Sequence, residues 1–100
     1  MAAYVIGRVQ IRNNDWVAEY GPKTAALVEK HGGKFLVRRG KMDKLEGKEA
    51  LPNVVVVIEF PSMDKAKAWY TDPDYAPMIK LRQTGADGEL MVVEGVQRGL

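Results

Sequence analysis

Histidine is the side chain whose unperturbed pKa lies closest to neutral pH, and His31 is the only histidine in the chain. It could therefore serve as a catalytic base. However, His31 ends a helical pattern just before Gly32 and Gly33, and a protonated imidazole interacts favourably with the free carbonyls at a helix C-terminus. A structural cap is thus favoured. No other histidine and no carboxylate at i+3 or i+4 completes a metal motif, so no metal site is expected.

Several aromatic residues lie in or near the predicted helices, where they either fill the core or line a pocket. Core filling is the more common role in a small protein. As pocket walls they would supply flat apolar surfaces, and tyrosine hydroxyls with the nearby Arg82 would fix a small polar or anionic ligand. The aromatic group is Trp16, Tyr20, Trp69, Tyr70 and Tyr75; the predicted ligand-binding residues are Tyr20, Trp69, Tyr75 and Arg82, and the candidates for catalysis are Tyr20, His31 and Arg82.

Other reactive side chains have simpler structural explanations. Ser62 lacks the G-x-S-x-G surroundings of a hydrolase nucleophile and is placed to cap a helix. Asp72 and Asp74 flank Pro73, which is typical of a turn. The chain has no cysteine, so thiolate nucleophiles and cysteine-based metal sites are excluded. No cofactor motif is present, and no cofactor is expected.

The composition is that of an ordinary globular protein, with 46% hydrophobic and 28% charged residues in a chain of 100. This length predicts a single domain over residues 1–100. The net charge of +2 is spread along the chain and offers no continuous track for phosphates, so nucleic acid is not an expected partner. The N-terminal apolar run is interrupted by Gly7 and Arg8, which argues against a signal or membrane span. The absence of cysteine suits a reducing cytosol, and a cytoplasmic protein is expected.

The order of predicted elements is strand, helix, strand, strand, helix, helix, strand. This order predicts an α+β fold, the ferredoxin-like split βαβ sandwich, with a four-stranded antiparallel sheet and helices on one face. The first and third strands are expected side by side in the centre and parallel. Strands are predicted at 3–11, 34–40, 53–60 and 88–96, a first helix from Pro22 to about His31, a second over 62–70, a third ending at Gly85, and a polar loop over 41–52.

The third strand, "NVVVVIEF", is apolar on both faces, although the helices of a small domain cover only one face of its sheet. The open face would carry Tyr4, Ile6, Val55, Val57, Met91 and Val93, an apolar patch larger than monomers usually expose. A second copy of the chain is the simplest cover, so a homodimer is predicted through this face. Arg8 and Glu59 are expected to form a buried ion pair there, which would set register or line a ligand cavity.

The segments "YVIGRVQI", "HGGKFLVRRG", "VVVVIEFPSMDKAKAWYTDPDY" and "LMVVEGV" together resemble an uncharacterised family, domain of unknown function 1330, of the dimeric α+β barrel superfamily. The resemblance covers nearly the whole chain. It implies a homodimer whose sheets pack face to face. Superfamily relatives include cofactor-free monooxygenases, lactone isomerases and haem-degrading enzymes, which work in a cavity between sheet and helices. The segment "EYGPKT" and the 41–52 loop depart from the family pattern.

Two functions are predicted. The first is a small homodimer that binds a small organic metabolite between sheet and helices, where the resemblance implies an oxygenase-like or isomerase-like reaction. The alternative is a non-catalytic structural or regulatory dimer without a pocket. An RNA-recognition module shares the element order, but it would need exposed aromatic residues on the third strand, where Val55, Val57 and Glu59 stand. A pocket containing the aromatic residues and a buried polar group would favour the first function.

Overall fold

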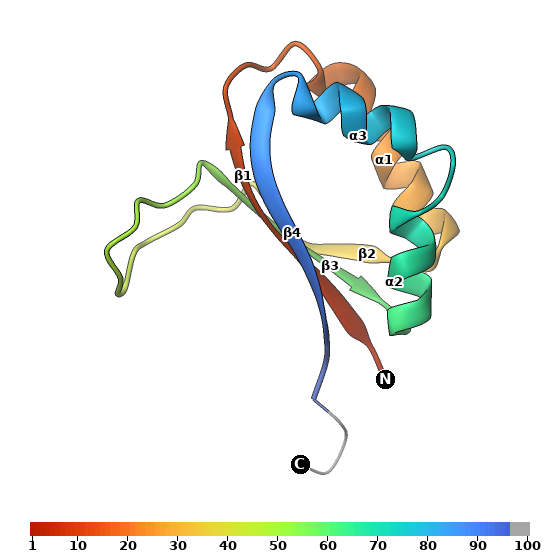
Figure 1. Cartoon of the computed structure of the whole chain (residues 1–100). Helices are drawn as coiled ribbons and strands as arrows, with labels where there is room; N and C mark the ends of the chain where they lie inside the picture. Colours follow the sequence, from red (N-terminus) through yellow and green to blue (C-terminus); the bar gives the residue numbers. More distant parts are fainter. Residues whose placement is uncertain (97–100) are drawn as a thin grey trace.

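A computed structural model describes residues 1–96 and has the predicted α+β, ferredoxin-like architecture. Four strands form one sheet in the order β2-β3-β1-β4, and the three helices lie on one side of it (Figure 1). None of the described helices is both long and apolar enough to cross a membrane. The elements are β1 (Ala3–Ile11), α1 (Val17–Lys30), β2 (Lys34–Arg38), β3 (Val54–Phe60), α2 (Met63–Tyr70), α3 (Ala76–Gln83) and β4 (Ala86–Glu94).

The central strands β1 and β3 are neighbours, as predicted, but they run antiparallel and not parallel. The prediction of parallel strands was wrong because the chain reverses direction between β2 and β3. Both β1 and β2 pair antiparallel with β3, so β1 and β2 run in the same direction and β3 returns against them. Strand β4 also pairs antiparallel with β1. Every neighbouring pair in the sheet is therefore antiparallel.

This direction overturns the expected pair between Arg8 and Glu59. In the antiparallel register Glu59 lies opposite Tyr4, whereas Arg8 lies opposite Val55. The two charges are thus displaced along the sheet and each finds another partner. The Tyr4 hydroxyl donates a 3.0 Å hydrogen bond to Glu59, whose other carboxylate oxygen lies 3.4 Å from the Lys34 ammonium group. Arg8 instead lies 3.6 Å from Glu49.

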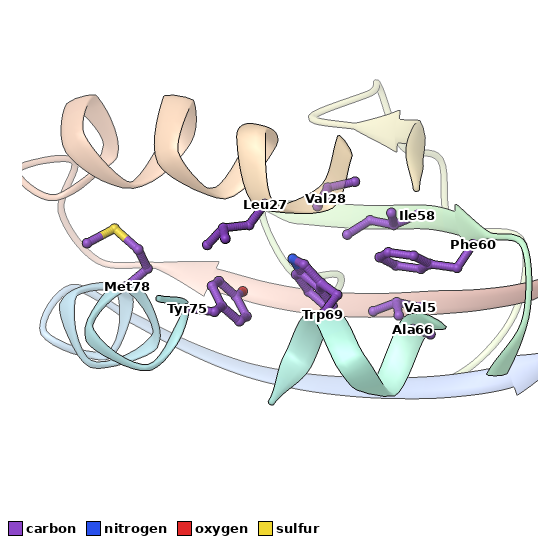
Figure 2. Packing of buried hydrophobic residues seen from close by; sticks show 9 residues of the cluster. All are labelled: Val5, Leu27, Val28, Ile58, Phe60, Ala66, Trp69, Tyr75 and Met78. Atoms are coloured by element: carbon purple, nitrogen blue, oxygen red, sulfur yellow. The ribbon is translucent and has the colours of Figure 1, made fainter. Parts of the chain in front are cut away.

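The core lies between the sheet and the helices, and alternation along β1 and β3 supplies its floor. Val5, Val9 and Ile58 point toward the helices and are buried, while Tyr4 and Val57 lie on the open face and are half-buried. Figure 2 shows the helical side of this core, where Trp69 and Tyr75 lie beneath α1. The side chains in Figure 2 are Val5, Leu27, Val28, Ile58, Phe60, Ala66, Trp69, Tyr75 and Met78.

Helix α1 is longer than predicted, because it continues through Gly21 and Pro22 without a break. A proline inside a helix cannot donate a backbone hydrogen bond and costs about 3 kcal/mol. The buried side of α1, which carries Thr24, Leu27 and Val28, packs on the sheet and offsets this cost. Ser62 is the N-cap of α2, as predicted, and its hydroxyl accepts a 3.1 Å hydrogen bond from the Lys65 N–H.

The face of the sheet opposite the helices is uncovered in the single chain. Met91 is 58% exposed and Val93 46% exposed there, beside the half-buried Ile6 and Val57. The 39–53 connection between β2 and β3 has no helix or strand and extends away from the helical layer (Figure 1). This connection carries Leu45, which is 96% exposed.

Candidate functional site

Two tyrosines and one arginine meet between α1 and α3. The hydroxyl oxygens of Tyr20, on α1, and Tyr75, which precedes α3, lie 2.6 Å apart. Arg82, near the end of α3, donates from Nη1 to both oxygens at 3.3 Å. The sequence predicted Tyr20, Tyr75 and Arg82 as ligand-binding residues, and the fold brings all three together. Their role in binding remains a prediction.

These residues border a cavity of about 120 Å³ between α1 and the sheet. Its floor is formed by β3 residues that include Val54, Val56 and Ile58. Four aromatic rings form its helical side, and consecutive rings lie close together: the Trp16 and Tyr20 centroids are 5.1 Å apart, those of Tyr20 and Tyr75 6.3 Å, and those of Tyr75 and Trp69 4.6 Å. We call this cavity the aromatic pocket; it is bounded by Trp16, Tyr20, Trp69, Tyr75, Val54, Val56 and Ile58.

Two residues that line the aromatic pocket each carry a buried polar atom without a hydrogen-bond partner. These groups are the Trp69 indole N–H and the Thr24 hydroxyl, on side chains that are 1% and 4% exposed. In Figure 2 the indole nitrogen of Trp69 points toward α1, the helix that carries Thr24. A buried polar group without a partner costs about 1 to 3 kcal/mol, so such groups are rare without a functional reason. The indole of Trp16, in contrast, donates to the Asn13 carbonyl at 2.8 Å.

The tyrosine pair adds a further hydrogen-bond donor. The pKa of Tyr75 is raised above the ordinary tyrosine value of 10.0, mainly by burial and secondly by the neighbouring Tyr20 hydroxyl. The Tyr75 phenol therefore stays protonated at physiological pH. One hydrogen bond between the two hydroxyls uses one of their two protons. The second proton has no acceptor among the described residues. It is therefore free to donate to a ligand oxygen.

A second, wider cavity of about 430 Å³ lies between α2 and β4. Trp69, Arg82 and Leu90 border both this cavity and the aromatic pocket, so these side chains form the partition between them. The wider cavity also contacts Lys67, Tyr70 and Met91. It contains no buried polar group without a partner other than Trp69 Nε1. The aromatic pocket is therefore the better supported site.

His31 lies outside the lining of both cavities. His31 is the C-cap residue of α1, but the predicted interaction of its imidazole with the helix carbonyls is not formed, because the imidazole bonds Asp72 instead. His31 Nε2 lies 2.8 Å from Asp72 Oδ2, and the Lys30 ammonium group donates to the same oxygen at 2.9 Å. The hydrogen bond from His31, then the Asp74 N–H and Lys30, hold the pKa of Asp72 well below its ordinary value of 3.8. This cluster ties α1 to the turn before α3.

The sequence did not single out the pocket residues Thr24, Phe35, Arg38 and Arg39. Thr24 follows the buried spacing of α1 and has no signal that separates it from a packing residue. Phe35 and Arg38 face the helices because a bulge at Leu36 interrupts the alternation of β2. A bulge of this kind cannot be read from the letters of one strand. Among residues 1–96, no group of three or more acidic or histidine side chains is placed to hold a metal ion.

Residues 2–96 match the family described as domain of unknown function (DUF1330). The chain belongs to this family. No curated protein matches it in sequence. The family description assigns no reaction, so the pocket geometry must carry the functional argument.

Solved structures with a similar fold include two proteins whose matches cover nearly all of this chain. The RPA0582 protein of unknown function from Rhodopseudomonas palustris is 20% identical, with a TM-score of 0.75 over 96% of this chain and 83% of that one. SnoaB, a cofactor-independent oxygenase from Streptomyces nogalater, is 13% identical, with a TM-score of 0.67 over 98% of this chain and 96% of that one. At these identities the likeness establishes the fold alone. It confirms the α+β architecture inferred from the element order.

Proposed function

We propose that this protein binds a small planar organic molecule in the aromatic pocket. The observation that carries the proposal is the pair of buried polar groups without partners, Trp69 Nε1 and Thr24 Oγ1, on two residues that line a cavity otherwise bordered largely by rings and aliphatic side chains. A ligand oxygen accepting from the indole would satisfy a donor that is otherwise buried at a cost. The aromatic walls would stack on a ring of the ligand.

The size of the pocket limits the ligand to about one ring. Its volume of about 120 Å³ is smaller than typical drug-sized sites of about 300 to 1,000 Å³. An apolar cavity of about 150 Å³ can hold benzene. The aromatic pocket is slightly smaller than that cavity, so it would take the ring end of a molecule whose substituents lie at the pocket mouth.

A cofactor-independent reaction on the bound ring is the enzymatic form of this proposal. SnoaB, which shares the fold, is a cofactor-independent oxygenase. In this chain Arg82 and the protonated Tyr75 hydroxyl stand where they would stabilise negative charge on a ligand oxygen during the reaction. Oxygen consumption with electron-rich phenols as substrates tests this form, and the Arg82→Gln variant should lower the rate.

Binding itself is best followed at the two indole N–H groups by NMR, because the chain has only two tryptophans. Trp16 is already hydrogen-bonded and Trp69 is not, so a ligand acceptor should move the Trp69 signal much further. The Trp69→Phe variant assigns the two signals. Phenol, benzamide and benzoate serve as single-ring probes. If none of them shifts the Trp69 signal or raises the melting temperature, binding of a single ring in this pocket is refuted.

We also propose that the protein forms a homodimer through the open face of the sheet. The exposed Met91 and Val93 and the half-buried Ile6 and Val57 form an apolar surface on one side of the sheet. Covering apolar surface contributes roughly 25 cal/mol per Å², which favours association of two such faces. The alternative of a dimer without a ligand lacks an explanation for the two unpartnered groups in the aromatic pocket.

A further inference from the structure

We infer that the ligand of the aromatic pocket is an anion, a ring that carries a carboxylate or similar acidic group, and that Arg38 and Arg39 bind its charge at the pocket mouth. This inference rests on the proposed function and adds the chemical class of the ligand. Among the lining residues, Arg38 and Arg39 are the exposed ones, so they stand at the rim where the pocket meets solvent. A ring inside the pocket would thus place its substituent beside them.

The position of Arg38 is fixed by the sheet. Arg38 lies opposite Val56 in the β2–β3 register, and Val56 belongs to the pocket floor, so Arg38 shares the face of the sheet that the helices cover. Its guanidinium lies 4.5 Å from the centroid of the Phe35 ring, which also lines the pocket. A cation stacked on an aromatic face is held in place and still has its N–H groups free to donate.

Arg39 has an unusual backbone. It is the only non-glycine residue among those described with a positive φ, at 61°. This left-handed conformation is uncommon for a residue with a long side chain and costs about 1 kcal/mol or more. Such strain is found preferentially at ligand sites, because selection for function maintains it. Arg39 directly follows the end of β2, and its side chain supplies a second guanidinium at the rim of the aromatic pocket.

The charge of the lining supports the same conclusion. Three arginines, Arg38, Arg39 and Arg82, border the aromatic pocket, and its lining includes no aspartate or glutamate. None of the three forms an ion pair with an acidic side chain in the described part of the chain, although Arg8 and Arg12 both do. Arginine donates hydrogen bonds and accepts none, and it matches a carboxylate well. With the Trp69 indole N–H, the pocket presents mainly donors to a ligand.

An inward-facing charge on an edge strand has another established role, which is to prevent pairing with another sheet edge. Strand β2 is an edge strand, so Arg38 fits that role as well. The two roles predict different results. Protection of the edge predicts aggregation when Arg38 is neutralised, with no change in ligand preference. Anion recognition predicts loss of the preference for a charged ligand.

The test compares benzoate with benzamide, which share a ring and differ in charge, by calorimetric titration of the full chain. We expect benzoate to bind at least about tenfold more tightly at low salt, and this advantage to shrink at high salt, because exposed charges are screened. In the Arg38→Gln/Arg39→Gln double variant the advantage should fall to about twofold or less. Lys65→Gln/Lys80→Gln is the matched control, since it removes two exposed positive charges at positions that line neither cavity.

Two results would overturn the inference while leaving the proposed function intact: equal affinity for benzamide and benzoate, or an unchanged preference for benzoate in the double variant. Loss of the preference in Lys65→Gln/Lys80→Gln would also overturn it, because the effect would then come from net charge. If neither compound binds the wild type, both proposals fail. Circular dichroism and the melting temperature of the double variant establish that it is folded.

Discussion

Tyr20 and Tyr75 are 55 residues apart in the sequence, yet their hydroxyl oxygens lie 2.6 Å apart. This contact joins the first turns of α1 to the start of α3 above the sheet. Arg82 donates to both oxygens and closes the cluster. The same three residues border the aromatic pocket, so the contact that fixes the helices also shapes the candidate site.

Removing the buried hydroxyl in Tyr75→Phe should destabilise the protein by about 1 to 2 kcal/mol, because its hydrogen bonds with Tyr20 and Arg82 are lost while the ring still packs. Affinity for benzoate should fall by several-fold in the same variant, since the pocket loses a donor. Urea unfolding and calorimetric titration measure the two effects. Tyr70→Phe is the control, because Tyr70 is 46% exposed and does not line the aromatic pocket. Equal effects in both variants would contradict this account of the Tyr75 hydroxyl.

Thr24→Val should have opposite effects on stability and binding. Valine has nearly the shape of threonine but no hydroxyl, so the substitution removes an unpartnered buried group and should raise the free energy of unfolding by about 1 kcal/mol. If the hydroxyl contacts the ligand, affinity should fall. Thr24→Ser keeps the hydroxyl and should keep the affinity. A more stable Thr24→Val protein with unchanged affinity for every probe would show that the hydroxyl takes no part in binding.

Asp72 should make the protein sensitive to acid. Its pKa is lower in the folded chain than its ordinary value of 3.8, so its charged form contributes stability at pH values above 3.8. That contribution is lost progressively as the pH falls below this value and the carboxylate is protonated. In Asp72→Asn, the free energy of unfolding should therefore be lower at neutral pH and should decline less between pH 4 and pH 2. Urea titrations across this range measure the difference.

Asp74→Asn provides the matched comparison for this pH dependence. Asp74 contacts the cluster through its backbone N–H, which the substitution keeps, and its side chain is exposed. The acid-side decline in stability should thus remain close to that of the wild type. His31→Gln should weaken the cluster and bring the acid dependence closer to that of Asp72→Asn, because the hydrogen bond from His31 is the largest cause of the lowered pKa. If the free energy of unfolding of the wild type did not decline between pH 4 and pH 2, this role of Asp72 would be contradicted.

Local patterns were sufficient to predict most of the fold. The alternation in β1 placed Val5 and Val9 under the helices, and the Ser62 cap marked the start of α2. The mistakes came from relationships between distant segments. The direction of β3 relative to β1 decides which residues face each other, and reading it as parallel produced the incorrect pairing of Arg8 with Glu59. Helix α1 passes through Pro22 because tertiary packing outweighs local propensity.

The candidate site was only partly readable from the sequence. Aromatic rings near helical segments suggested Tyr20, Trp69 and Tyr75, and the fold does gather them around one cavity. Whether a buried polar group has a partner depends on the exact packing around it, so nothing in the letters distinguished Trp69 from Trp16. Arg38 faces the pocket only because of the bulge in β2, which the sequence did not reveal.

The proposed dimer can be tested at the centre of the open face. Val57 lies opposite Ile6 there, and Val57→Lys would place a charge within the proposed interface while facing solvent in a single subunit. We expect the wild type to sediment as a dimer and Val57→Lys to sediment as a folded monomer with a lower melting temperature. Ala26→Lys, which adds the same charge on the exposed side of α1, should remain dimeric. A wild type that sediments as one subunit at every concentration would rule out this dimer.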